Sequence, residues 1–336
     1  MTARTLRFVV PTGVDDPARV SGGNVYDRHV RDGLGHRGWI VDAREVPDAA
    51  AAASTLRTAP DDTVVLVDGL VAGWAADAVA AAGRRTRLAV LAHMVVAAFV
   101  DASPAAVAAE RQALAAAHSV ITTSCWTADE LVRRGLADRS RIVVAPPGVH
   151  PAPTVARPAG DGDLLCVGVV APHKGHDTLL DALDRVDADW TCTIAGSTDV
   201  DADFASAVVA RADAFGGRIR FAGVLDRTAM ADAYRRSALL VAPSRVESAG
   251  MAIGEARARG IPVLATTAGG IPDTVAGGGA MLVPPGDAAA LADALDAWMT
   301  DPALRTRLRA EARRARRALP SWDDTVTAIE TVLEEL

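Results

Sequence analysis

The chain has 336 residues, half of them hydrophobic, and a formal net charge of −7 at pH 7. A chain of this length usually forms about two domains, and its apolar residues suffice for a sizeable core. The acidic balance argues against a nucleic-acid-binding protein, which would carry a basic stripe. The part up to His150 carries roughly equal numbers of acids and bases, so the negative excess lies later. An anionic substrate bound there needs local donors.

The sequence predicts a cytoplasmic protein without an integral membrane segment. No stretch reaches the roughly 18 uninterrupted apolar residues of a membrane span, and the first residues lack the apolar core of a signal peptide. Cys125, Cys166 and Cys192 show no Cys-x-x-Cys spacing, which predicts neither a disulfide framework nor a zinc site. The apolar run from Met94 to Val100 is most simply a buried loop or helix. The alternative is a wall for the acceptor or a peripheral membrane contact.

In the first half, short β-rich runs alternate with longer helical patterns, which is typical of a parallel sheet with crossover helices. The predicted strands are 6–11, 39–43, 63–68, 88–93, 119–123 and 141–145. The predicted helices are 24–36, 71–83, 105–117 and 127–134. Pro146-Pro147-Gly148 stops this pattern, and residues 149–162, rich in Pro, Ala and Gly, are the predicted linker.

The same rhythm restarts after the linker. The predicted strands are 163–168, 190–195, 218–222, 238–242, 262–266 and 280–283, and three helical segments close the chain from about residue 287. We therefore predict two doubly wound, Rossmann-like α/β domains, residues 1–150 and 151–318, and a final helix within 319–336. Ligands of such sheets bind outside the carboxyl ends of the strands. Two facing domains would form a cleft suited to a small molecule.

Lys174 is the only lysine in the chain, and it lies in Pro172-His173-Lys174-Gly175, where a predicted strand leads into a predicted helix. An ammonium on a flexible stem suits a phosphate oxygen, and a helix N-terminus adds unpaired N–H groups and a positive dipole end. For one residue alone, a solvated lysine at a helix start is the simpler interpretation. Two glutamates on a second strand–loop–helix turn downstream favour the phosphate.

Glu247 lies in the loop after a predicted strand, and Glu255 lies eight residues later. We predict that a helix begins around Ala249, so that the N–H groups of Ala249, Gly250 and Met251 are unpaired and point toward a ligand. Glu255 would then lie about 9 Å further along the helix axis. Two carboxylates so spaced would accept hydrogen bonds from hydroxyls at separate places on one long ligand. The alternative is that both acids only stabilise the helix N-terminus.

The first half offers a glycine pair and a histidine as candidates. Gly22 and Gly23 close the loop after the first strand and open a helix, where their N–H groups would reach a phosphate. Such a pair more often forms an ordinary loop. His93 ends a predicted strand, at the carboxyl edge where site residues gather, although a lone histidine is often structural. Later in the chain, Gly269-Gly270 before Pro272 predicts a tight loop and a helix that starts at proline.

Several other functions lack their motifs. The chain has no Gly-x-x-x-x-Gly-Lys-Ser/Thr element and no Gly-x-Gly-x-x-Gly after the first strand, which weakens a nicotinamide oxidoreductase hypothesis. It has no Gly-x-Ser-x-Gly nucleophile elbow. Asp199, Asp201 and Asp203 resemble a metal site but precede a predicted helix without further ligands, which favours N-capping. We predict no metal site.

Taken in order, these segments resemble the retaining, nucleotide-sugar-dependent glycosyltransferases of family four, which have the GT-B fold. The resemblance covers nearly the whole chain, and its most specific part is the Glu-x7-Glu pair with the upstream Lys-Gly. The segments that carry it are Gly22-Gly23, Glu110 to Ser124, Pro147-Gly148-Val149, Val167-Gly168, Lys174-Gly175, Glu247 with Glu255, Gly269-Gly270-Ile271-Pro272-Asp273 and Trp322. In this family, a final helix of the kind that contains Trp322 packs back on the N-terminal domain.

The resemblance implies a site in which Lys174 holds the donor diphosphate, helped by Gly22 and Gly23. It places Glu247 at the sugar hydroxyls and Glu255 at the ribose hydroxyls of the nucleotide. The segment Ser248-Ala249-Gly250-Met251 would lie close to the donor.

The family also implies that His93 lies near the reacting sugar and the acceptor, as a catalytic residue with Lys174 and Glu247. The family transfers sugar with retention, by same-face attack in which the leaving diphosphate helps to take the acceptor proton. The expected co-substrate is a UDP- or GDP-sugar, with no tightly bound cofactor. The expected acceptor is a small or lipid-linked molecule.

The sequence departs from the family pattern at two positions. The family commonly has an arginine after the glycine that corresponds to Gly168, whereas this chain has Val169. It also often has an aromatic residue at the position of Ala249. Together the two departures leave the identity of the donor and the level of activity undecided. Apart from them, the nearest enzymatic alternative is a different GT-B reaction, such as glycoside phosphorolysis or nucleotide-sugar epimerisation. Val169 also leaves open a sugar-nucleotide-binding protein without turnover.

Overall fold

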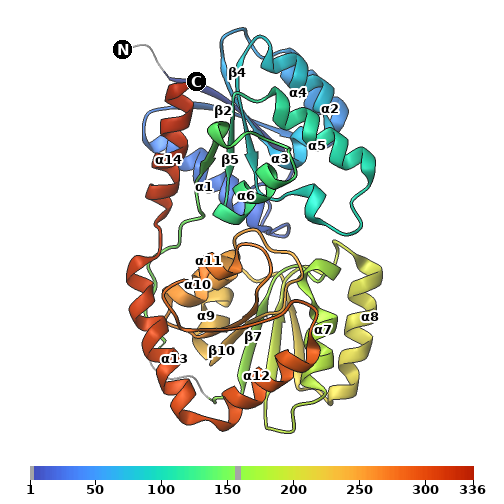
Figure 1. Cartoon of the computed structure of the whole chain (residues 1–336), viewed down its shortest axis with the longest axis vertical. Coiled ribbons are helices and arrows are strands. Elements are labelled where there is room, and N and C mark those ends of the chain that lie inside the picture. The colour runs from blue at the N-terminus through green and yellow to red at the C-terminus, as the bar shows by residue number, and fades with distance from the viewer. Residues whose placement is uncertain (1–3, 156–159) are drawn as a thin grey trace. The chain divides into compact units, whose positions relative to one another are not determined.

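The computed structural model describes residues 4–155 and 160–336, which form two compact units (Figure 1). Unit 1 extends to Asp16 and continues with Gly22–Gly148 and Pro320–Leu336, whereas unit 2 comprises Pro17–Ser21 and Val149–Leu319. Residues 156–159 of the predicted linker, and residues 1–3 of the N-terminal segment, lie outside the described residues.

Unit 1 contains a sheet of six parallel strands in the order β2-β1-β3-β4-β5-β6. These are β1 Thr5–Pro11, β2 Ile40–Val46, β3 Val64–Asp68, β4 Arg87–Ala92, β5 Ser119–Thr122 and β6 Ile142–Val144. The strand order reverses between β1 and β3. In open α/β sheets, such a switch point holds ligands at the carboxyl ends of the strands.

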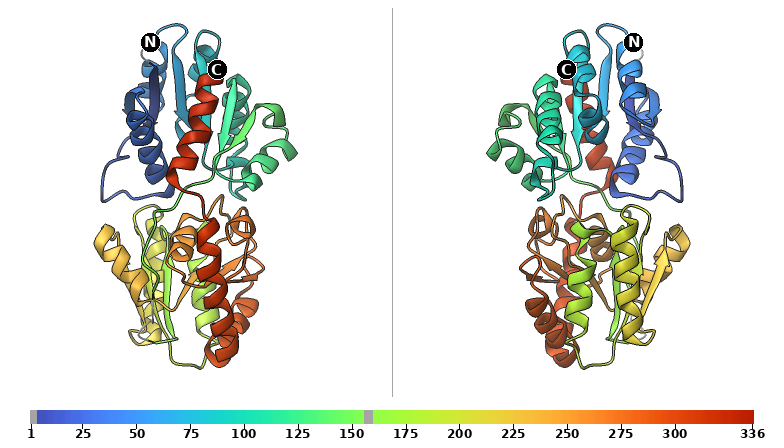
Figure 2. Two further views of the ribbon diagram at one scale, coloured as in Figure 1. Left: turned by 90° about the vertical axis from the view of Figure 1, so that its left-hand side faces the viewer. Right: turned by 90° about the vertical axis from the view of Figure 1, so that its right-hand side faces the viewer.

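The helices of unit 1 cover both faces of this sheet. They are α1 Gly22–His36, α2 Ala49–Arg57, α3 Gly69–Trp74, α4 Ala76–Gly83, α5 Pro104–Ala116, α6 Cys125–Arg133 and α14 Trp322–Glu335. Helices α2 to α6 contribute to one core, and α1 and α14 contribute to the core on the opposite face. Helix α14, red in Figures 1 and 2, packs against α1, blue. The predicted return of the last helix to the N-terminal domain is confirmed.

Unit 2 contains a second sheet of six parallel strands, in the order β12-β11-β10-β7-β8-β9, with its switch point between β7 and β10. The strands are β7 Asp163–Val167, β8 Thr191–Ala195, β9 Ile219–Gly223, β10 Leu239–Ala242, β11 Val263–Thr266 and β12 Ala280–Val283. The helices are α7 His176–Leu183, α8 Ala202–Ala212, α9 Arg227–Arg236, α10 Met251–Ala258, α11 Ile271–Thr274, α12 Ala288–Thr300 and α13 Pro302–Ala315. The predicted fold class, two doubly wound parallel-sheet domains, is confirmed.

Local sequence signals set many helix ends. Asp201 accepts a hydrogen bond from the N–H of Phe204 at the start of α8, so the predicted N-capping role of this acidic run is confirmed. Ser321 and Asp324 form a reciprocal capping box at the start of α14. Gly260 has φ +70° just after α10, as a helix C-terminus favours.

Three local predictions differ from the structure. The predicted helix 71–83 is two helices, which meet at Ala75, and α2 was not predicted at all. Helix α10 begins at Met251 rather than at Ala249, because Gly250 adopts the left-handed conformation with φ +66°. In the run from Met94 to Val100, only Val95 is buried, and both end residues are exposed. The interpretation of that run as a buried loop or helix therefore holds only in part, because Ala97 and Ala98 of the 3-10 helix Val96–Ala98 pack against the core while both ends of the run are exposed.

Within residues 4–155 and 160–336, no helix combines the length and the apolar character that crossing a membrane requires.

Replacing either of two glycines of α1 by alanine should have opposite effects on the stability of the fold. A methyl group at Gly33 would lie 2.5 Å from Cγ2 of the buried Val326 on α14, whereas one at Gly35 meets nothing within 4 Å. Because alanine favours a helix over glycine by about 1 kcal/mol, Gly35→Ala should raise the free energy of unfolding by up to that amount. Gly33→Ala should lower it by about 1–3 kcal/mol through overpacking. Urea unfolding measures both, and equal effects would show that α14 does not pack there in solution.

Candidate functional site

The switch point of unit 2 brings together the lysine and the first glutamate that the sequence singled out. Lys174 ends the short 3-10 helix Pro172–Lys174 after β7, and Glu247 lies in the loop between β10 and α10. Nζ of Lys174 donates a 2.6 Å hydrogen bond to Oε2 of Glu247. Both side chains are about one fifth exposed, at 22% and 17%. The charged pair is therefore sheltered but open to a ligand.

The loop of Lys174 and the loop of Glu247 are locked together by a close backbone approach. Gly175 has φ +71°, and a Cβ at this position would lie 2.1 Å from the carbonyl oxygen of Pro243. Only glycine therefore fits. The N–H groups of Arg245 and Val246 both donate to the carbonyl oxygen of His173, at 2.7 and 3.3 Å. Lys174 and Glu247 are positioned by backbone contacts as well as by their mutual attraction.

The guanidinium of Arg245 reinforces the same junction. It donates 2.8 Å hydrogen bonds to both carboxylate oxygens of Asp177, to Oγ1 of Thr178 and to the carbonyl oxygen of Pro172. A bidentate pair of this kind fixes orientation as well as distance. Arg245 thus joins the β10 loop to the first turn of α7. Sequence reasoning missed this role, because an arginine in the loop after β10 has no distinctive spacing from the lysine 71 residues upstream.

Glu247 is held by further hydrogen bonds. Its Oε1 accepts from the N–H of Gly250 at 3.2 Å, and its carbonyl oxygen accepts from the N–H of Gly270 at 2.9 Å. A Cβ at Gly269 would lie 1.8 Å from that carbonyl oxygen, which explains the predicted Gly269-Gly270 pair. Burial would raise the pKa of Glu247, but Lys174 overrides this effect and holds the pKa below its usual value. The side chain is a carboxylate at neutral pH.

This geometry corrects one expectation about the loop. The N–H of Gly250 is not unpaired but bound to Glu247. Because α10 begins at Met251, helical rise does not set the distance between Glu247 and Glu255. Ser248 and Ala249 are buried in the loop, and the carbonyl oxygen of Ala249 accepts a 2.5 Å hydrogen bond from Oγ1 of Thr274.

Glu255 lies on α10 in a different environment. Burial raises the pKa of its carboxyl group, while Arg259, the Tyr234 hydroxyl and His150 oppose the rise. Among the described residues, no hydrogen bond or ion pair joins Glu255 to Lys174 or Glu247. A methyl group at Gly254, just before it, would lie 3.0 Å from Cγ1 of Val149. Close packing against this side chain explains the glycine inside α10.

The switch point of unit 1 gathers a second polar group around His93. His93 follows β4, and its Nε2 lies 2.9 Å from Oδ1 of Asp27 and 3.2 Å from Oδ2 of Asp68. Asp68 ends β3 and Asp27 projects from α1. Gly23 lies against the ring, where a Cβ would be in ordinary contact, 3.5 Å from Cδ2 of His93, so the ring alone does not require glycine here. Gly22, the first residue of α1, is exposed.

The charges around His93 are mostly buried. Asp27 and Asp68 are 1% and 3% exposed, and 15% of the His93 side chain is exposed. Burial alone lowers the pKa of His93, but the two carboxylates override it and raise the pKa to about 10. Within the described part of the chain, these three residues are the one group whose atoms are near enough to share a metal ion. Their distances are also those of ordinary charged hydrogen bonds.

Sequence reasoning missed Asp27 and Asp68. Asp68 carried a usable signal, because it ends the fully buried strand VVLVD, at the carboxyl edge of the sheet. Asp27 carried none, because a single acid within an amphipathic helix is usually solvated.

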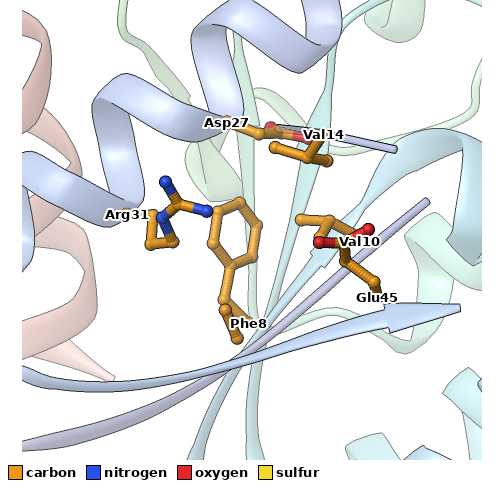
Figure 3. Close-up of a pocket in the computed structure, with 7 residues that line it drawn as sticks. Phe8, Val10, Val14, Asp27, Arg31 and Glu45 are labelled. Carbon is orange, nitrogen blue, oxygen red and sulfur yellow. The ribbon is translucent and has the colours of Figure 1, made fainter. Parts of the chain in front are cut away.

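Asp27 also lines a small cavity of about 40 Å³ beneath α1 (Figure 3). Figure 3 shows Asp27, Arg31 and Glu45 arranged around the ring of Phe8. The volume suits one or a few water molecules rather than a sugar. This cavity is therefore not a substrate site.

The C-terminal unit matches a known family. Residues 153–315 match the model described as Glycosyl transferases group 1. The D-inositol 3-phosphate glycosyltransferase of Xylanimonas cellulosilytica is 32% identical over 240 residues, which cover 66% of this chain and 57% of that protein. That of Streptomyces avermitilis is 34% identical over 251 residues, which cover 67% and 53%. The chain belongs to the group 1 glycosyl transferases. It spans about half the length of the curated relatives it matches.

Solved structures of the same architecture support the fold. A sucrose-phosphate synthase from Thermosynechococcus elongatus superposes with a TM-score of 0.83 at 21% identity, covering 99% of this chain and 98% of that one. The HepE protein of Anabaena, solved in complex with UDP and glucose, superposes with a TM-score of 0.77 at 18% identity, covering 98% and 99%. At this identity the likeness concerns the fold alone, and it confirms the GT-B prediction.

The Lys174–Glu247 pair predicts a pH-dependent stability difference. Because the pKa of Glu247 is lowered in the folded state, its carboxylate stabilises the fold above its unfolded pKa of about 4.3, and this contribution is lost as the pH falls. Glu247→Gln should therefore cost about 1–3 kcal/mol at pH 7 and less below about pH 4. Urea unfolding from pH 3.5 to 7 measures the difference. In a Lys174→Met background the pH dependence should largely vanish, and its persistence would contradict the pairing.

Proposed function

We propose that the chain is a glycosyltransferase that moves a sugar from a nucleoside diphosphate sugar to an acceptor hydroxyl, with retention of anomeric configuration. Family membership supports sugar transfer in general. The observation that carries the donor proposal is the chain's only lysine, fixed by Glu247 at the switch point of unit 2. This is where a doubly wound domain binds a phosphorylated ligand.

In unit 2, we assign each predicted residue a part in holding the donor. The ammonium of Lys174 binds the diphosphate, and Glu247 accepts hydrogen bonds from the sugar hydroxyls while fixing the lysine. Ser248, Ala249 and Gly250 shape the loop at the sugar, and Met251 supplies the first N–H of α10. Glu255 accepts hydrogen bonds from the ribose hydroxyls. Ion pairing with Lys174 keeps Glu247 charged for this task.

In unit 1, we propose that the N–H groups of Gly22 and Gly23 bind a phosphate oxygen and that His93 acts at the reacting sugar and the acceptor. The bond from the anomeric carbon to the diphosphate oxygen breaks as the acceptor oxygen attacks from the same face. The acceptor proton passes to the leaving diphosphate, so charges and atoms balance. Stabilising that diphosphate is the main electrostatic task, which falls to Lys174.

The names of similar proteins suggest which substrates to test first. HepE was solved with UDP-glucose, so a UDP-sugar is our first candidate donor, with a GDP-sugar next. The curated relatives are named for D-inositol 3-phosphate, which makes a phosphorylated polyol the first candidate acceptor, ahead of other small or lipid-linked alcohols. We also propose a cytoplasmic location, because Cys125, Cys166 and Cys192 are all free thiols.

Two alternatives compete with this function, and the second is motivated by Val169, which stands where the family commonly has an arginine. Another GT-B reaction, phosphorolysis or epimerisation, would consume its substrate without an acceptor alcohol. A sugar-nucleotide-binding protein would bind the nucleotide and make no product with any acceptor. A panel of nucleoside diphosphates screened by thermal stabilisation identifies the base. Incubating the matching sugar donor with and without acceptors then decides among the three.

Lys174→Ala should weaken nucleoside diphosphate binding by about 10–100-fold and leave nucleoside binding nearly unchanged, because a charged hydrogen bond contributes about 1.5–3 kcal/mol. Calorimetric titration with both ligands measures the two affinities. Arg185→Ala is a matched control, because it removes an exposed cation that follows α7 at the amino edge of the same sheet. Equal weakening of both ligands by Lys174→Ala would contradict a diphosphate role.

Glu255→Ala should weaken donor binding by about tenfold through the loss of ribose hydrogen bonds. A donor with deoxyribose should bind the wild type more weakly and bind the variant no worse than the ordinary donor. Calorimetric titration of the wild type and the variant with both donors gives the four affinities needed to compare the two losses. If removing the ribose hydroxyls costs the variant as much as it costs the wild type, Glu255 does not contact the ribose.

A further inference from the structure

Two buried carboxylates share one nitrogen of His93. Oδ1 of Asp68 accepts hydrogen bonds from the N–H groups of Leu70 and Val71, at 2.8 and 3.1 Å, while its Oδ2 faces Nε2 of His93. Oδ1 of Asp27 faces the same nitrogen. Because carboxylates only accept, Nε2 must carry a proton. The open question is whether the other ring nitrogen, Nδ1, carries one as well.

The surroundings of Asp27 answer this question. Its Oδ2 is buried and has no hydrogen bond partner among the described residues, so a proton on that oxygen would find no protein acceptor among them. A proton on Oδ1 would meet the proton on Nε2. Burial raises the pKa of Asp27 to about 6, against the opposing effect of His93, so Asp27 is ionised at neutral pH. A neutral ring would then leave two buried negative charges beside each other. A positive ring reduces that cost.

The other groups that pack against the His93 ring do not change its expected charge. From α1, Tyr26 packs edge-on at 5.1 Å, but its hydroxyl donates to the carbonyl oxygen of Ala145. From the segment after β5, Oγ1 of Thr123 donates to the backbone carbonyl of His93. Arg31, which lines the cavity with Asp27, is bound to Asp15 and Asp32. The two aspartates are thus the charged groups that face the imidazole.

We propose that Asp27 and Asp68 are positioning residues that hold His93 as an imidazolium, so that its Nδ1–H donates a hydrogen bond to a substrate oxygen and cannot accept the acceptor's proton. Nδ1 forms no hydrogen bond to a described residue, and part of the side chain is exposed. The raised pKa of His93, about 10, agrees with this charge state. The inference deepens the proposed function and depends on it for the identity of the substrate.

The proposal separates two roles that a histidine can play in sugar transfer. A neutral imidazole with a bare Nδ1 would serve as a general base, and activity would fall as the pH drops below its pKa. An imidazolium serves as a donor to an oxygen that gains negative charge. The acceptor proton must then go to the leaving diphosphate, as in the reaction proposed above.

NMR of the full-length protein with ¹³C-labelled histidine tests the charge state without any substrate. The His93 signal, assigned by its loss in His93→Gln, should report a protonated ring up to at least pH 8. In Asp27→Asn and in Asp68→Asn, the ring should titrate nearer its ordinary value of about 6.5. Asp15→Asn, which removes a carboxylate near α1 that does not face His93, should leave the titration unchanged. A wild-type His93 that is neutral at pH 7 would overturn the proposal.

Activity adds a readout that a merely structural role would not change. In Asp27→Asn, kcat/KM should match the wild type most closely near pH 6 and fall about tenfold per pH unit above the new pKa of His93. A loss that is equal at every pH, in a variant with a wild-type melting temperature, would refute the positioning role. So would saturable Zn²⁺ binding that His93→Gln abolishes. If His93 titrates as expected and no sugar is transferred to any acceptor, only the proposed function fails.

Discussion

The site of unit 2 depends on the contact between two loops at the carboxyl ends of β7 and β10. Gly175 adopts a left-handed conformation, and its missing side chain lets the carbonyl of Pro243 approach. Any larger residue would push the loops apart and lengthen the 2.6 Å hydrogen bond from Lys174 to Glu247. Because folding has already fixed this long side chain, a ligand does not bear the full entropy cost of ordering it. The missing side chain of Gly175 therefore keeps Lys174 and Glu247 within hydrogen-bonding distance.

Both units place charged groups at the switch point of a parallel sheet, but the ratio of cationic to anionic groups differs between them. In unit 2, one ammonium faces one carboxylate, and the lysine can still donate its remaining hydrogens. In unit 1, one imidazole faces two carboxylates that are almost fully buried. The first arrangement lowers the pKa of the acid, and the second raises the pKa of the base. Topology fixes where such groups gather, and burial and partners decide their charge.

The sequence predicted the alternating strands and helices because parallel sheets have buried, β-rich strands separated by amphipathic helices. It predicted Lys174 and Glu247 because both follow strands at conspicuous turns. It failed where tertiary contacts override local signals. Gly250 delays the start of α10, and no local pattern shows that Oε1 of Glu247 binds its N–H. The two aspartates around His93 were missed for different reasons. Asp68 ends β3, the strand that pairs with β4, and its position could have been noticed. Asp27 lies on α1, and residue spacing does not reveal its pairing with His93.

Val169 gives the loop of Lys174 particular weight in the proposed reaction. A family member with arginine at this position has a second cation for the diphosphate, and Arg245 is poorly placed to replace it. Its guanidinium is already bound to Asp177, Thr178 and the carbonyl of Pro172. Breaking these hydrogen bonds would destabilise the contact between the β10 loop and the first turn of α7, which positions Lys174. In unit 2, the proposed reaction relies on the ammonium and on the N–H groups at the start of α10, whose dipole favours an anion, together with the N–H groups of Gly22 and Gly23 in unit 1. Stabilisation of the leaving diphosphate therefore depends more on how these donors are positioned than on how many cations surround it.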